Sequence, residues 1–142
     1  MTRPAFMSPA WLALAQAALQ AALDQHPERD RLHLSLIERF HNLTADAPRP
    51  AGGGEPCLRL DVADGRAQVR YGTQPGERTE TEITCDWMDA WRSASLHAGP
   101  DLTNLRAEQI ATGQLRMTGD LTAWAPLLAP VHEHMADHTP PP

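Results

Sequence analysis

Histidine is the residue type in this chain whose spacing comes closest to metal chemistry. His132 and Glu133 could begin the His-Glu-x-x-His helix of a zinc protease, but the position of the second histidine is Ala136. His134 and His138 are four residues apart and could share a helix face, yet two imidazoles without a third ligand rarely form a zinc site. We therefore expect solvated histidines near the end of a helix and no bound metal.

Other catalytic patterns are also missing from the sequence. Cys57 and Cys85 are too few for a disulfide framework and too far apart for a Cys-x-x-Cys motif, so we expect two reduced thiols in the core. There is no Gly-x-Ser-x-Gly elbow, no Walker loop and no Gly-x-Gly-x-x-Gly motif. The three glycines at 52–54 indicate a flexible connection, because no lysine follows them. The sequence thus predicts a protein that is not an enzyme and needs no cofactor.

Length and composition indicate one globular domain. The 142 residues are 42% hydrophobic and 21% charged, and we expect an ordered core over about residues 8–136 with a disordered tail at 139–142. The net charge of −6 opposes nucleic acid and anionic lipid surfaces as partners. Because no apolar run is long enough to span a membrane and no signal peptide is evident, we expect a cytoplasmic protein.

Two helices are predicted in the first third of the chain. Ser8 followed by Pro9 is a typical helix start, and apolar residues recur at helical spacing up to His26-Pro27. A second helix is predicted from about Glu28 to the proline and glycine cluster at 48–56. Its apolar face would contain Leu32, Leu36, Ile37, Phe40 and Leu43.

The middle of the chain predicts strands. Alternating apolar residues at 58–62 and 67–71 flank Asp64-Gly65, a strong hairpin signal, and a third alternating run follows at 79–85. We expect a three-stranded antiparallel meander with one wet face. Asp86 then begins a helix that Gly99-Pro100 ends, and Asp101 caps the next one.

The last part of the chain carries the most specific pattern. Gly113 can end a helix in a left-handed conformation, Leu115 and Met117 alternate with polar residues as in a short strand, and Gly119-Asp120 can lead into a capped final helix. This pattern resembles the C-terminal signature of the sterol carrier protein type 2 family, as in a bacterial standalone member. The resemblance covers roughly residues 8–136 and is strongest over 79–135.

The resemblance implies an α/β (α+β) fold with a mostly antiparallel sheet of four to five strands. Helices would cover one face, with an apolar tunnel between sheet and helices. Periodicity alone favours an ordinary core for the many tryptophans and methionines, whereas the resemblance implies that those of the C-terminal half line a ligand pocket. The candidate ligand-binding residues are Trp87, Met88, Trp91, Leu105, Ile110, Met117, Trp124 and Leu128.

The function that the resemblance implies is non-enzymatic binding or transport of an apolar molecule. The ligand would be a fatty acid, an acyl-CoA, or a sterol- or isoprenoid-like lipid. Two alternatives stay open. The chain could be an accessory protein in quinone biosynthesis that presents a lipid intermediate to a partner enzyme, or a structural module, such as a homodimerisation domain, without a ligand.

Overall fold

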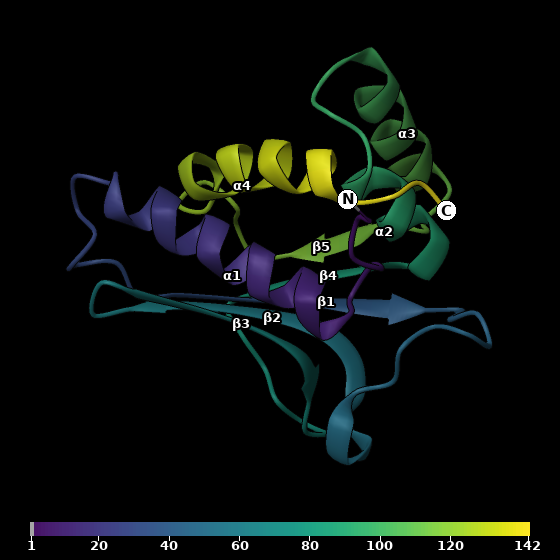
Figure 1. Ribbon diagram of the computed structural model, residues 1–142, viewed down its shortest axis with the longest axis horizontal. Helices are drawn as coiled ribbons and strands as arrows, with labels where there is room; N and C mark the ends of the chain where they lie inside the picture. The colour runs from purple at the N-terminus through teal and green to yellow at the C-terminus, as the bar shows by residue number, and fades with distance from the viewer. Residues whose placement is uncertain (1) are drawn as a thin grey trace.

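The computed structural model describes residues 2–142 and shows a sheet with helices on one of its faces (Figure 1). In chain order the elements are α1 (Pro9–Asp24), β1 (Leu34–His41), the 3-10 turn η1 (Ala51–Gly53), β2 (Glu55–Ala63), β3 (Arg66–Thr73), β4 (Thr81–Asp86), α2 (Trp87–Ala94), α3 (Pro100–Ala111), β5 (Arg116–Thr118) and α4 (Ala125–His138). Helices α1 and α4 lie side by side over the sheet, and α3 projects away from it.

The sheet has five strands in the order β3-β2-β1-β4-β5. The predicted hairpin is confirmed: β2 and β3 are antiparallel and joined at Asp64-Gly65, and both residues have the positive φ that this tight turn requires. The predicted meander is wrong at its last step, because β4 pairs with β1 and not with β3. That pairing is parallel, so the sheet is mixed, while the α+β fold class is confirmed.

Strand β1 corrects the predicted second helix. Leu36, Ile37 and Phe40 have the spacing of a helix face, but they lie in the central strand, where Leu36 and Phe40 face the helices and Ile37 faces the other side. All three are at most 4% exposed. A strand covered on both faces loses the simple alternation of apolar and polar residues, which is why its pattern imitates a helix.

Helix α1 forms as predicted. The Ser8 hydroxyl accepts a hydrogen bond from the Trp11 amide, and the buried face consists of Trp11, Ala15, Leu19 and Leu23. Two glutamines of α1 reach the edge strand β3: Gln16 accepts from the Val69 amide at 3.0 Å, and Gln20 from the Ala67 amide at 2.9 Å. These bonds satisfy amides that an edge strand otherwise leaves free for another chain.

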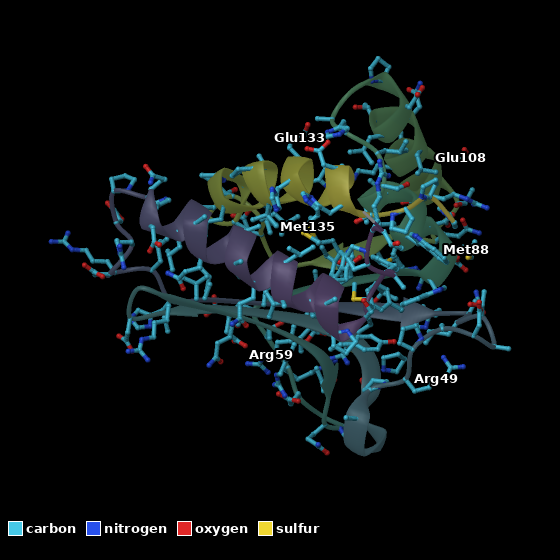
Figure 2. The ribbon with its side chains drawn as sticks, viewed as in Figure 1. Arg49, Arg59, Met88, Glu108, Glu133 and Met135 are labelled. Carbon is cyan, nitrogen blue, oxygen red and sulfur yellow. The ribbon has the colours of Figure 1, made fainter. Side chains whose placement is uncertain are left out.

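The face of the sheet away from the helices is covered by charged side chains. The loop after β3 brings Glu77 under the sheet, where its carboxylate lies 2.6 Å from Arg59 Nη1 and its carbonyl accepts from Arg39 at 2.9 Å. Figure 2 shows Arg59 on this side. Ile37 and Cys57 are fully buried on this face, and both cysteines are free, as expected.

The chain beyond α4 is held against the core. Thr139 is completely buried, and its hydroxyl accepts a hydrogen bond from Trp11 Nε1 at 2.9 Å. Trp91 Nε1 donates to the Pro140 carbonyl at 2.6 Å. Two indole N–H groups of the core therefore use these two residues as acceptors, and the disorder expected over 139–142 stays a prediction.

The connection between α2 and α3 is tied to α4. His97 places its two ring nitrogens 2.8 Å from carboxylate oxygens of Glu133 and Asp137, and the Ala98 amide donates to Glu133 at 2.7 Å. Figure 2 shows Glu133 on the side of α4 away from the sheet. We call these residues the His97 clamp.

Candidate functional site

Five side chains form a line across the helix-facing side of the sheet. Register places Tyr71, Leu58, Glu38, Ile83 and Met117 next to one another on β3, β2, β1, β4 and β5. Their side faces the helices, because Tyr71, Leu58 and Ile83 pack against the core that α1 and α4 also form. We call this line the cross-strand row. Leu58 is 9% exposed and Met117 is 48% exposed, so the row is covered at its centre and open at the β5 edge.

Two glycines place β5 at that edge. Gly113 follows α3 with φ of 77° and donates to the Ile110 carbonyl, which confirms its predicted role in ending the helix. Gly119 has φ of 86° and lies so close to β4 that a Cβ atom would overlap the Glu80 carbonyl oxygen and lie 2.9 Å from Thr81 Cα. Only glycine fits both demands at position 119.

Asp120 does not cap the final helix. Its carboxylate accepts hydrogen bonds from the Thr122 amide at 2.9 Å and from the Thr122 hydroxyl at 2.6 Å, and α4 begins only at Ala125. The predicted cap at Asp120 is therefore wrong, because α4 begins about one helical turn further along the chain. The aspartate instead closes the turn that leads from β5 into α4, and these bonds lower its pKa.

Glu38 is the acidic group in the cross-strand row. It is half-buried, and its Oε1 accepts a hydrogen bond from the Cys85 thiol at 3.2 Å. Burial raises the pKa of Glu38, since the apolar surroundings disfavour its charged form. Burial also raises the pKa of Cys85, and the neighbouring carboxylate adds to that effect, so this thiol is not an activated nucleophile.

Arg106 and His132 are the ionisable groups that α3 and α4 bring to this region. The positive charge of Arg106 acts on Glu38, while partial burial lowers the pKa of Arg106. Burial likewise lowers the pKa of His132, whose Nε2 lies 2.6 Å from the Leu96 carbonyl. The charge of Arg106 thus acts on both Glu38 and His132.

The predicted lining residues fall into three groups. Trp87 and Trp124 are each 1% exposed and belong to the core; the ring of Trp87 lies 5.4 Å from that of Phe40. Within the described part of the chain, Trp87 Nε1 has no hydrogen-bond partner. The half-buried predicted residues are Met88, Trp91, Leu105 and Leu128.

The third group is exposed. Met117 is 48% exposed and Ile110 is 60% exposed, which makes them the large hydrophobic residues with the most open surface among residues 2–142. Register brings Met117 beside Ile83, a residue that the sequence did not single out. Whether the eight predicted residues bind a ligand is not decided by these positions, and their role stays a prediction.

Sequence reasoning also missed Glu38 and Arg106. Leu34, Leu36 and Phe40 occupy alternate positions of β1, and Glu38 takes the position between the last two on the same face of the strand. This pattern could have marked Glu38, but it is not visible when the segment is interpreted as a helix. Nothing in the local sequence marks Arg106, because its proximity to Glu38 depends on how α3 is placed.

Surface hollows occur beside α2 and α3. One of about 230 Å³ is lined by residues such as His41, Thr84 and Arg116, and another of about 340 Å³ includes Asp89 and Glu108. Neither reaches α1 or α4, where the tunnel was expected. Between these helices and the sheet the described side chains pack into a core that includes Leu19, Leu127 and Met135.

Metal ligands are not clustered in the described residues. The rings of His134 and His138 are tilted by 32° with their centroids 4.5 Å apart, and no group of three or more side chains that could hold a metal ion occurs among residues 2–142. In the same part of the chain, no helix is both long and apolar enough to cross a membrane.

Comparison with known proteins identifies the fold. No protein-family model and no curated protein matches the sequence. Among solved structures, the chain is similar to a conserved hypothetical protein from Thermus thermophilus, described as possibly a sterol carrier protein, with 15% identity, a TM-score of 0.53 and coverage of 99% of this chain and 96% of that one.

Two further solved structures agree. A sterol carrier protein 2 shows 15% identity and a TM-score of 0.54 over 94% of this chain and 98% of its own. The sterol carrier protein domain 2 of Helicoverpa armigera shows 15% identity and a TM-score of 0.51 over 90% of this chain and 87% of its own. The chain therefore has the sterol carrier protein 2 fold, and the resemblance inferred from its sequence is confirmed at that level.

Proposed function

We propose that this protein is a non-enzymatic carrier of an apolar molecule, which it binds on the helix-facing side of β4 and β5. The observation that carries the proposal is the cross-strand row, an apolar surface that becomes exposed towards Met117. The fold supports it, because one solved structure that matches over nearly the whole chain is described as sterol carrier protein 2 and another as possibly a sterol carrier protein.

Binding would be driven by burial of apolar surface. Each methylene group moved from water gains about 0.8 kcal/mol, and covering Met117 adds to that gain. Ile83 and Leu128 are half-buried and pack against the core, so they would form the inner side of the site while Met117 forms its rim. Helix α3 packs mainly against α2 and projects away from the sheet, so it leaves the β5 edge open.

Titration with a fluorescent fatty acid tests the proposal. Saturable binding with a change in tryptophan emission is expected, because Trp87, Trp91 and Trp124 all lie in the C-terminal half of the chain. Binding that never saturates would contradict a defined site.

A pair of variants locates the site. Met117→Gln should weaken binding by about tenfold, since it removes apolar contact of the order of 1–2 kcal/mol. Thr118→Gln is the matched control: it is the next residue on β5, its side chain points to the other face, and it should bind like the wild type. Both replacements are neutral, so neither changes the attraction of a charged ligand. Equal affinity in the two variants would remove Met117 from the site.

Mass spectrometry of molecules extracted from the natively purified protein tests the ligand class. A specific lipid would support the carrier function, and a polyprenyl phenol would direct it to quinone biosynthesis. If nothing is extracted and no titrated lipid binds saturably, the structural-module alternative replaces the proposal.

A further inference from the structure

Helices α2 and α3 border a polar hollow that the proposed apolar site does not use. Its volume of about 340 Å³ is within the range of small-molecule sites. None of its residues belongs to the cross-strand row. Figure 2 shows Glu108 on α3 and Met88 on the neighbouring α2. We call it the acidic hollow, and its lining consists of Asp86, Asp89, Arg92, Leu105, Glu108, Gln109 and Gln114.

Negative charge predominates in the acidic hollow, because three carboxylates and one guanidinium line it. Asp86 is already satisfied: its Oδ1 accepts from two backbone amides of α2 at 3.0 and 3.3 Å, and its Oδ2 accepts from Asn42 at 3.1 Å. Asp89 has a long contact of 3.4 Å with Arg92 Nη1. Among residues 2–142, no ion pair involves Glu108. Asp89 and Glu108 therefore remain available to a cation.

The carboxylates of the acidic hollow also repel one another. Burial raises the pKa of Asp89, and the negative charges of Asp86 and Glu108 raise it further. The positive charge of Arg92 offsets this effect only in part. A bound cation would relieve the repulsion between these groups.

The spacing of the carboxylates favours an organic cation over a metal ion. Among residues 2–142, no group of three or more His, Cys, Asp or Glu side chains is placed to hold a metal ion. Carboxylates that do not converge on one metal ion can still bind separate ammonium groups, because each ammonium donates its own hydrogen bonds.

Gln109 is an independent sign of a ligand in the acidic hollow. It lines the hollow although it is only 2% exposed, and within the described part of the chain its Nε2 has no hydrogen-bond partner. A buried donor without an acceptor is costly, and such groups are rare in folded proteins. An oxygen atom of a bound molecule would supply the missing acceptor.

We propose that the acidic hollow binds a small diamine that carries a carbonyl or hydroxyl oxygen. Its two ammonium groups lie at Asp89 and Glu108, and its oxygen accepts the free hydrogen bond of Gln109. Two positive charges also match the excess of two negative charges in the lining. Because the acidic hollow is separate from the proposed apolar site, this inference does not depend on the carrier function.

Titration with L-lysinamide and 1,5-diaminopentane, followed by nuclear magnetic resonance, tests the inference. Both probes are dications at about pH 6.5, since their amines are protonated there, but only lysinamide has a carbonyl oxygen. We expect saturable binding of lysinamide in about 0.15 M salt, with a shift of the Gln109 side-chain amide signal. Diaminopentane should bind about tenfold more weakly, because it leaves Nε2 of Gln109 without an acceptor.

Variants distinguish a defined site from general attraction to an acidic protein. Glu108→Gln should weaken lysinamide binding about tenfold, because a charged hydrogen-bond partner is lost. Glu28→Gln is the matched control: it removes the same charge from an exposed glutamate between α1 and β1, and it should bind like the wild type.

Gln109→Leu tests the oxygen contact. Both probes should bind to this variant with the affinity that diaminopentane has for the wild type, because the donor is missing. Thermal unfolding verifies that each variant is folded. If Gln109→Leu does not fold, the two probes on the wild type and the Glu108→Gln variant still decide.

Three results would overturn the inference. Lysinamide could fail to bind saturably, the two dications could bind with equal affinity, or Glu28→Gln could weaken binding as much as Glu108→Gln, which would indicate attraction by net charge. None of these results affects the carrier function, which the fatty acid titration tests by itself.

Discussion

Replacing Gly119 by alanine should destabilise this protein more than a glycine in a surface turn would. Gly119 has φ of 86°, and a Cβ atom there would overlap the backbone of Glu80. Strand β4 cannot move away, because its other edge is paired with β1. The new methyl group must therefore push β5 away from β4.

The magnitude follows from two costs. The left-handed conformation costs a non-glycine residue about 1–2 kcal/mol. Forcing an extra carbon into a packed contact costs about 1–3 kcal/mol more, so Gly119→Ala should lower the free energy of unfolding by about 2–5 kcal/mol in total. Gly76→Ala isolates the first cost, because Gly76 has φ of 87° and no atom within 4 Å of the added carbon.

Urea unfolding followed by tryptophan fluorescence measures both variants. The reasoning is refuted if Gly119→Ala loses no more stability than Gly76→Ala, because close approach to β4 would then carry no energy. Ligand affinity provides a second reading, since displacing β5 moves Met117, whereas the turn at Gly76 lies outside the proposed site.

Three further predictions concern hydrogen bonds. Asp120→Ala should lower stability and Asp120→Ser much less, because serine can still accept from the Thr122 amide; equal losses in urea unfolding would show that the charge is needed. The His97 clamp should make stability depend on pH. Because the pKa of His97 is raised, its contribution to stability is complete below pH 6.5 and is lost as the pH rises through the raised pKa. Because the pKa of Glu133 is lowered, its contribution is lost when the pH falls below 4.5. Melting temperatures from about pH 5 to 9 should therefore fall towards high pH in the wild type and stay flatter in His97→Gln, and parallel profiles would contradict the clamp. Trp11→Phe keeps a ring in the core but removes the buried hydrogen bond to the C-terminal segment, and should cost about 1–3 kcal/mol in the same unfolding assay; an unchanged stability would mean that this segment is not held by the indole.

Sequence signals were sufficient to predict the features that depend on only a few neighbouring residues, such as helix ends and tight turns. Ser8-Pro9 marks the start of α1, Asp64-Gly65 marks the hairpin, and Gly113 marks the end of α3, because each depends on the conformation of a few neighbouring residues. Strand β1 could not be recognised in this way. Its two covered faces result from packing with the charged loop on one side and the helices on the other, which no local pattern contains.

In the candidate site, too, the residues that a local sequence pattern marks could be predicted and the others could not. Met117 could be chosen as a candidate because it alternates with polar residues in a short strand. Glu38 was missed because its segment was assigned to the wrong element. Tryptophan type alone could not distinguish core from pocket, since Trp87 and Trp124 are almost fully buried while Trp91 is half-buried.

The parallel pairing of β1 with β4 has a consequence for how fast the chain folds. It joins Leu36 to Thr81 and His41 to Asp86, and the hairpin of β2 and β3 lies between the paired strands in the chain. Contacts between distant segments slow folding, because the entropy of closing the loop is lost before the contacts form. We expect changes at the Asp64-Gly65 turn to slow folding, and changes in β5 to accelerate unfolding while leaving the folding rate unchanged. The binding surface would then be the last part of the molecule to form and the first to open.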